Sequence, residues 1–151
     1  MTMKLTALAD VAGLAKTLPQ ADLAALEAAR ARQNSLTKPP GSLGLLEDLA
    51  CFMASWRGVD RPTISRAQAV VFAGNHGICA QGVNPYPQAV TAQMVLNFLA
   101  GGAAINVLCR THGLKLQVVD AGVAYDFADA PGLTHAKVAM GTRNFALEPA
   151  M

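Results

Sequence analysis

The side chains best suited to chemistry follow a short apolar run at residues 69–73, where the chain turns through Gly74-Asn75-His76-Gly77. A buried strand that ends in glycines and polar side chains is how open α/β sheets build ligand sites at their carboxyl edge. Glycine lets backbone N–H groups approach a ligand closely. A neutral imidazole such as that of His76 can form a hydrogen bond with polar atoms at the edge of the ligand. The same turn can form without any ligand, because asparagine tolerates unusual backbone angles and histidine can cap a strand end.

A second group of candidate binding side chains comes soon after this turn. Tyr86, Gln93 and Met94 combine a flat aromatic ring, an amide and a flexible thioether, with Pro87 and Gln88 between them. This mixture suits a planar heteroaromatic ligand with one or two ring nitrogens. Met94 also has apolar neighbours in its own segment, which is the usual setting of a core methionine, so core packing is an equal alternative for it.

Three further features have both a structural and a functional interpretation. Gly101-Gly102 favours a helix break over a phosphate cradle, because no Lys or Ser/Thr follows at P-loop spacing. Lys38 stands before two prolines and is expected to be a solvated turn residue. Asp120 ends an apolar segment, where a carboxylate can bind ribose or metal or can cap the following turn.

The elements that position these residues begin with helices. Residues 21–32 are rich in helix formers, and Thr17 with Gln20 fits a capping box before them. Pro39 and Pro40 must end that helix. Pro40-Gly41 suits a type II turn, and Ser42 is placed to cap a second helix. That helix shows apolar residues at helical spacing, namely Leu46, Leu49, Met53 and Trp56.

From residue 66 the hydrophobic period changes to that of a parallel sheet. The pattern predicts two strands, at residues 67–73 and 116–120. Between them it predicts two helices, at residues 90–99 and 103–112, and Gly113 is placed to cap the C-terminus of the second. This pattern predicts one βαβ crossover whose strands end on the same edge, and a further short strand is expected around 137–140. The predicted fold class is α/β, with an incomplete parallel-sheet Rossmann-like βαβ core after the N-terminal helices of a small helical domain. The predicted domains are residues 1–60 and 61–151.

Composition narrows the function classes. The chain has 151 residues, is 52% hydrophobic and carries a net charge of +2, so a packed core is expected and a clustered basic face for nucleic acid is not. Neither an apolar run of spanning length nor a signal peptide is expected, which favours a cytoplasmic protein without membrane contact. Cys51, Cys79 and Cys109 lack metal-ligand or disulfide spacing and are expected to be buried free thiols, and no metal or cofactor is expected.

Taken in order, several motifs make the chain resemble the nicotinate-nucleotide:dimethylbenzimidazole phosphoribosyltransferases of cobalamin assembly. They are Lys38-Pro39-Pro40-Gly41-Ser42-Leu43-Gly44, the 74–77 turn, the stretches 81–88 and 90–94, Gly101-Gly102-Ala103-Ala104-Ile105-Asn106, and the segments 118–124, 137–139, 141–144 and 149–151. The resemblance implies transfer of 5-phosphoribosyl from nicotinate mononucleotide to 5,6-dimethylbenzimidazole, giving nicotinate and α-ribazole 5′-phosphate with inversion. It also implies a homodimer at full length.

The resemblance assigns candidate substrate contacts residue by residue. It places Tyr86, Val90 and Met94 in the benzimidazole pocket, and the substrate-binding set that we expect is Asn75, His76, Gly77, Tyr86, Val90, Gln93 and Met94. Many members of the family have aspartate where this chain has Asn75, so no catalytic carboxylate is assigned there. In the family, the glutamate that acts as general base lies close to the C-terminus of a chain more than twice this long, and a Gly-Glu-x-Gly segment that holds the nucleotide lies near the middle.

Neither of those segments is found in this sequence, whose glutamates Glu27, Glu47 and Glu148 match neither. We therefore expect an N-terminal portion that is inactive alone, without a catalytic residue of its own, and that exposes Val70, Val71, Phe72, Val118 and Val119.

Two other function classes are open. One is a non-catalytic module that binds a nucleotide or a partner. The other is a metal-dependent phosphoesterase, suggested by Gly74-Asn75-His76 but lacking the aspartates and further histidines of such a site.

Overall fold

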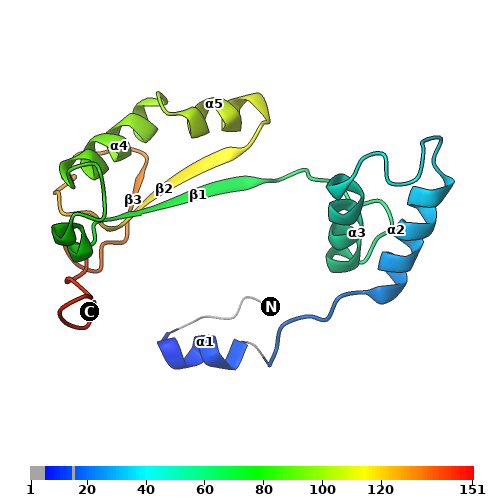
Figure 1. The fold of residues 1–151 in the computed structure, drawn as a ribbon, viewed down its shortest axis with the longest axis horizontal. Coiled ribbons are helices and arrows are strands. Elements are labelled where there is room, and N and C mark those ends of the chain that lie inside the picture. The colour runs from blue at the N-terminus through cyan, green and yellow to red at the C-terminus, as the bar shows by residue number, and fades with distance from the viewer. Residues whose placement is uncertain (1–5, 15) are drawn as a thin grey trace. The chain divides into compact units, whose positions relative to one another are not determined.

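The computed structural model describes residues 6–14 and 16–151. The chain divides into two compact units, Met1–Ile64 and Ser65–Met151, coloured blue to teal and green to red in Figure 1. The boundary that the sequence suggested, between residues 60 and 61, stays a prediction. All the candidate substrate contacts lie in the second unit.

The first unit contains α1 (Leu8–Leu14), α2 (Leu23–Ser35) and α3 (Leu45–Arg57). The expected capping box at Thr17 is wrong. The N-cap of α2 is Asp22, whose Oδ1 accepts the N–H of Ala25 at 2.9 Å, while the Thr17 hydroxyl donates to Leu14 O at the end of α1. Asp22 lies directly before the first helical residue, and its short carboxylate reaches the free N–H groups of the first turn.

The turn before α3 has the predicted form. Ser42 N–H donates to Pro39 O at 3.1 Å, and Gly41 has a φ of 76°, as the third residue of a type II turn requires. Ser42 is nevertheless not the cap of α3. The N-cap is Gly44, and Glu47 Oε1 accepts the N–H of Leu43.

The contact between α2 and α3 is made by small side chains. Ala29 of α2 packs with Cys51 and Ala54 of α3, because small residues let two helix backbones approach closely. The helix predicted from the apolar spacing of Leu46, Leu49, Met53 and Trp56 is present, but three of these, Leu46, Leu49 and Trp56, are exposed. The apolar period therefore located α3 without identifying the face that it buries.

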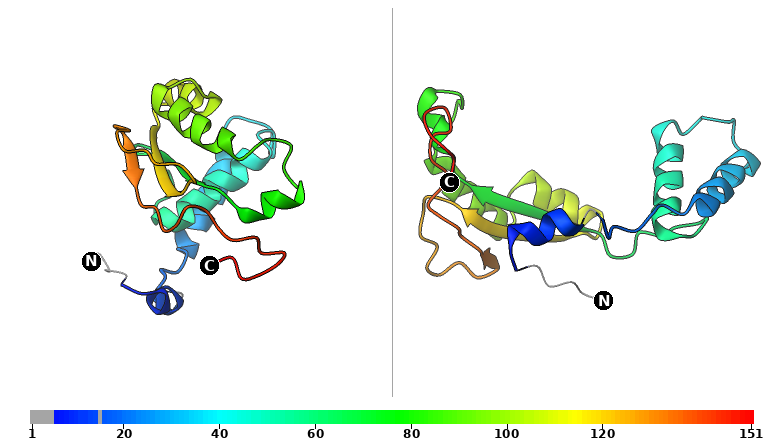
Figure 2. Two further views of the ribbon diagram at one scale, coloured as in Figure 1. Left: turned by 90° about the vertical axis from the view of Figure 1, so that its left-hand side faces the viewer. Right: turned by 90° about the horizontal axis from the view of Figure 1, so that it is seen from below.

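The second unit is a parallel sheet with helices on one face. It contains β1 (Gln68–Gly74), η1 (Gly77–Gln81), α4 (Ala89–Ala100), α5 (Ala104–Thr111), β2 (Lys115–Gly122) and β3 (Leu133–His135). The strand order is β1-β2-β3, with Val71 opposite Val118 and Gly74 opposite Gly122. Helices α4 and α5 both lie on the same face of the β1–β2 pair (Figures 1 and 2). The predicted α/β class and parallel βαβ unit are confirmed.

The third strand lies earlier than expected. It spans Leu133–His135 rather than 137–140 and pairs in parallel with Val118, Val119 and Asp120 of β2. The chain after it stays attached to β2, because Ala136 N–H donates to Asp120 O and Val138 N–H donates to Ala121 O. Backbone pairing with β2 therefore continues into the predicted segment, although no further strand forms there.

The core of this unit lies between the sheet and α4. Val95 and Val123 are fully enclosed, with Val118, Phe127 and Leu133 around them. Val118 and Val119 are buried, so their expected exposure is wrong, and Val118 belongs to the core cluster. The β1 residues Val70 and Phe72 are 42% and 72% exposed, as expected for β1 at the edge of the described sheet.

Residues 89–111 include the longest apolar helical stretch that the structure describes. Contrary to the sequence expectation, the stretch is long and apolar enough to span a membrane by length and composition, with a mean hydropathy of 1.5. It is interrupted at Gly101, whose φ is 81°, and the two helices α4 and α5 pack on the sheet. Core helices of globular domains pass the same test, so this finding is weak evidence for a membrane span. The predicted helix break at Gly101-Gly102 is confirmed.

The three cysteines are free thiols in the structure. Cys51 and Cys109 are buried as expected, whereas Cys79 in η1 is only half-buried. Its place in a short 3₁₀ helix at the end of the sheet leaves one side of the residue open.

Candidate ligand-binding site

Asn75 holds together three segments at the carboxyl end of the sheet. Its Oδ1 accepts the N–H of Ala124 at 2.8 Å, and its Nδ2 donates to Gln88 O and to Thr91 Oγ1 at 3.1 and 3.2 Å. The residue is buried. Both ends of its amide are therefore used in tying β1 to the loop after β2 and to the start of α4. This structural role differs from the unusual backbone angle that the sequence suggested, because the φ of Asn75 is not positive. Contact of Asn75 with substrate stays a prediction.

The rest of the 74–77 turn packs against residues 141–144. Gly77 N–H donates to Thr142 O at 2.9 Å, and Thr142 N–H donates to Asn75 O at 3.0 Å. A Cβ at Gly77 would lie 2.5 Å from the backbone nitrogen of Asn144. The glycine is required by this close approach of two backbones, and the N–H groups of Asn75 and Gly77 donate to protein carbonyls rather than being open to a ligand.

His76 lies on the exposed side of this turn. Its Nδ1 is 3.4 Å from the hydroxyl of Thr142, and its side chain lines an apolar cavity of about 340 Å³ with Phe72, Val138 and Met151. Sequence reasoning placed His76 beside the other candidate contacts, but it shares this cavity with Asn75 and not with the candidate contacts among residues 86–94.

Tyr86, Val90 and Met94 come together as the resemblance implied. They line one groove of about 310 Å³ between α4 and β1, and Gly74 and Thr91 also contribute to it. Tyr86 is 66% exposed, and Met94 is also accessible at 37%. Because Val90 and Met94 are four residues apart, they share one face of α4. Met94 is thus not enclosed in the core.

Gln93 faces a different pocket on the other side of α4. This pocket, of about 470 Å³, is also lined by Asn75, Gln88, Ala124 and Tyr125. The predicted contacts other than Gly77, which lines none of them, are therefore divided among three hollows, of which two include Asn75. One residue of difference along a helix turns a side chain by about 100°, so a single list of residues along the chain could not predict this division.

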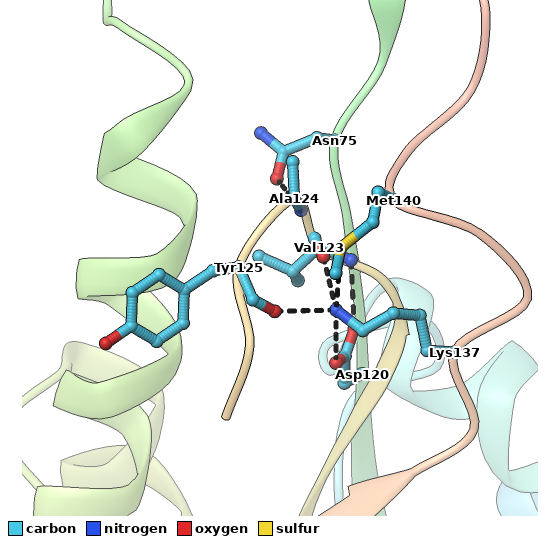
Figure 3. Close-up of polar contacts among 7 residues, drawn as sticks. All are labelled: Asn75, Asp120, Val123, Ala124, Tyr125, Lys137 and Met140. Carbon is cyan, nitrogen blue, oxygen red and sulfur yellow. Dashed lines mark hydrogen bonds and ion pairs between the residues drawn. The ribbon is translucent and has the colours of Figure 1, made fainter. Parts of the chain in front are cut away.

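Asp120 and Lys137 form an ion pair in which the carboxylate is buried and the ammonium is partly buried. Asp120 is fully buried, its Oδ1 accepts the N–H of Val123 at 2.9 Å, and its Oδ2 lies 3.0 Å from Lys137 Nζ. Figure 3 shows this arrangement together with Asn75 and Ala124. Of the two interpretations of Asp120, the cap of the following turn is confirmed. Sequence reasoning missed Lys137, and its only signal was that it lies in a motif of the resemblance.

Lys38 is also not the solvated residue that was expected. Its Nζ lies 2.7 Å from Glu47 Oε1, and the two side chains are only 13% and 15% exposed. This hydrogen bond, followed by that from Leu43 N–H, lowers the pKa of Glu47. The pair closes the 38–44 turn of the first unit.

Among residues 6–14 and 16–151, no three His, Cys, Asp or Glu side chains lie together in a geometry that could hold a metal ion. The Asn-His turn therefore has no described ligand set of the phosphoesterase kind around it.

Comparison with known proteins gives consistent results. Residues 18–151 match the family model described as phosphoribosyltransferase. A nicotinate-nucleotide–dimethylbenzimidazole phosphoribosyltransferase from Rhodobacter capsulatus is 56% identical over 138 residues, which is 89% of this chain and 41% of the relative. A second protein of that name from the same organism is 60% identical over 115 residues, covering 76% of this chain and 99% of the relative.

A solved structure shows the same fold. The nicotinate-nucleotide–dimethylbenzimidazole phosphoribosyltransferase of Thermus thermophilus superimposes with a TM-score of 0.79 at 47% identity, over 86% of this chain and 39% of that one. The chain thus spans about two fifths of the length of the first relative and of this structure. The residues that match the family model, 18–151, include both pockets beside α4.

Proposed function

The chain belongs to the nicotinate-nucleotide:dimethylbenzimidazole phosphoribosyltransferase family, and from this membership we propose that it serves the transfer of 5-phosphoribosyl from nicotinate mononucleotide to 5,6-dimethylbenzimidazole. The products are nicotinate and α-ribazole 5′-phosphate. The observation that carries the proposal is the groove of Tyr86, Val90 and Met94 at the carboxyl end of β1, where open α/β sheets bind ligands.

The groove suits the acceptor base. A flat ring can lie against Tyr86 and Met94, while Val90 and β1 supply an apolar floor. The volume of about 310 Å³ is at the small end of the range for ligand sites, which fits a bicyclic base better than a whole nucleotide. We assign to this chain the binding of the benzimidazole.

The chemistry needs a base that this groove does not include. The bond from the anomeric carbon to the nicotinate nitrogen breaks, and its electron pair leaves with nicotinate. The unprotonated ring nitrogen of the benzimidazole bonds to the opposite face of the sugar, and the N–H of its other ring nitrogen gives its proton to the base. The three glutamates of the chain are all described. Glu47 is paired with Lys38, Glu27 with Arg30 and Glu148 with Arg143, and none of them lines the groove. We propose that the proton acceptor is a glutamate outside residues 1–151.

The proposed setting is a cytoplasmic homodimer of full-length chains that acts on small molecules, without nucleic acid or membrane. No cofactor is needed for a displacement of this kind, since nicotinate itself is the leaving group.

Two measurements test the function. Equilibrium dialysis of the chain against dimethylbenzimidazole is expected to show one binding site. Joining the chain to the remaining C-terminal part of the Rhodobacter capsulatus relative is expected to give nicotinate release that depends on dimethylbenzimidazole, with the intact relative as reference. A joined protein that folds and binds the base but releases no nicotinate would favour a non-catalytic binding module and would overturn the proposed activity.

A further inference from the structure

The ammonium group of Lys137 lies in a cage of oxygen atoms. Its Nζ is 3.0 Å from Asp120 Oδ2 and 2.7 Å from Tyr125 O, and it also donates to Val123 O. The side chain is only 23% exposed, and the Phe127 ring covers it with its centroid 5.8 Å away. Figure 3 shows the three oxygens converging on Nζ. A carboxylate and two carbonyls in one partly buried place need a cation. Lys137 Nζ donates to the two carbonyls and to Met140 Sδ, and Asp120 Oδ2 is its counter-ion.

These contacts fix the path of the chain after β2. The two carbonyls that Lys137 binds belong to Val123 and Tyr125, on either side of Ala124. Asp120 adds a second restraint, because its Oδ1 accepts the Val123 N–H. The N–H of Ala124 is thereby held 2.8 Å from Asn75 Oδ1.

Asn75 connects this loop to the groove of Tyr86, Val90 and Met94, which we call the acceptor groove. With its Oδ1 engaged by Ala124, its amide is oriented so that Nδ2 donates to Gln88 O and Thr91 Oγ1 at the start of α4. Thr91 lines the same groove as Val90 and Met94. An unbroken series of contacts therefore joins Lys137 to the wall of the groove.

We propose that Lys137 is a positioning residue for the acceptor groove, acting through Ala124 and Asn75 on the first turn of α4. The inference rests on the proposed function for the identity of the ligand, but its structural part can be tested without it. Among the described residues, no hydrogen bond or ion pair joins Lys137 to the groove directly, so we expect an effect on base binding to pass through the loop.

The test uses chemical rescue. Lys137→Ala removes three methylenes and the ammonium, which is the size of propylammonium. We expect Lys137→Ala to bind dimethylbenzimidazole about tenfold more weakly and to exchange the Ala124 and Thr91 amide hydrogens faster, since a charged hydrogen-bond partner is lost. Propylammonium should restore both properties, and propanol should restore neither. Lys115→Ala, at the exposed start of β2, controls for loss of one positive charge.

The possible outcomes separate the two proposals. If the unaltered chain does not bind dimethylbenzimidazole, the proposed function fails, and amide exchange alone decides the positioning role. If Lys137→Ala folds with unchanged base affinity and unchanged exchange at Ala124 and Thr91, the positioning role is wrong. A loss that propanol restores as well as propylammonium also rejects it. If Lys137→Ala does not fold even with propylammonium, Lys137→Met, which keeps the apolar stem, is measured in the same way.

Discussion

Lys38 Nζ lies 2.7 Å from Glu47 Oε1, across the Pro39-Pro40-Gly41 turn, and both side chains are shielded from water. Glu47 also accepts the N–H of Leu43, so one carboxylate closes the turn at two points. The Lys38 hydrogen bond is the main cause of the lowered pKa of Glu47, and the Leu43 N–H is the second.

This pair predicts a pH-dependent contribution to stability. Because the pKa of Glu47 is lower in the folded than in the unfolded state, its contribution is fully present above the unfolded pKa and is lost as the pH falls through the folded pKa. Glu47→Gln should therefore lower the melting temperature of the chain at neutral pH, and the difference should shrink in acid. Thermal melts by circular dichroism at neutral and acidic pH measure this. Glu27→Gln, whose pair with Arg30 is exposed, is the matched control and should change little. A Glu47→Gln penalty that is the same at both pH values would contradict the prediction.

Gly77 should not tolerate a methyl group. The added Cβ would meet backbone atoms of Asn144, Arg143 and Thr142 at 2.5 to 2.8 Å, and none of these is a side chain that can swing away. Gly77→Ala is expected to cost about 1–3 kcal/mol of unfolding free energy, as overpacking usually does. Gly74→Ala is the control from the same turn, because its Cβ would have ordinary contacts at 3.7 Å or more. Urea unfolding of both variants decides the matter, and equal stabilities would show that residues 141–144 move aside.

The acceptor groove predicts a selective loss of base binding. Met94→Ala and Tyr86→Ala remove accessible contact surface from the groove and should weaken dimethylbenzimidazole binding by about 0.5–1.5 kcal/mol each, the value of an aromatic or thioether contact. Binding of nicotinate mononucleotide should change less. Gln93→Ala, on the other side of α4, is the control. Equal losses for both ligands, or a larger loss in the control, would place the base elsewhere.

Residues 1–151 alone should not make α-ribazole phosphate. The chain offers no glutamate at the groove, and loss of a general base costs roughly 10²- to 10⁴-fold in rate. Chromatography of nicotinate released from nicotinate mononucleotide in the presence of dimethylbenzimidazole tests this. Turnover close to that of the Rhodobacter capsulatus relative would mean that a residue of this chain acts as the base.

The exposed side chains of β1 predict self-association of the chain. Phe72 and Val70 present apolar surface on an edge strand, and such edges pair with other chains. Phe72→Lys should shift the chain toward monomer in light scattering and reduce binding of a hydrophobic dye. Phe145→Lys, which alters an exposed aromatic residue away from the strands, should do neither. A monodisperse monomer of the unaltered chain that melts cooperatively would show that residues 1–151 form a self-sufficient domain.

Local patterns in the sequence determined the elements and the fold class. Glycine and proline punctuation located the turn at Pro40-Gly41 and the break at Gly101-Gly102, since these residues restrict or free the backbone wherever they stand. The change from helical to strand period predicted the parallel βαβ unit, and ordered motifs indicated the family. All of these signals lie within short stretches of chain.

The tertiary structure alone decided how the candidate residues are used. Asn75 meets Ala124 across 49 positions, and this contact makes its amide a brace rather than an open ligand group. Gln93 and Met94 are neighbours in the chain but line different pockets. Lys137 becomes a partly buried cation only because β2 and the loop after it bring a carboxylate and two carbonyls together. Such roles depend on distant segments meeting, and neither the residue nor its chain neighbours carry that information.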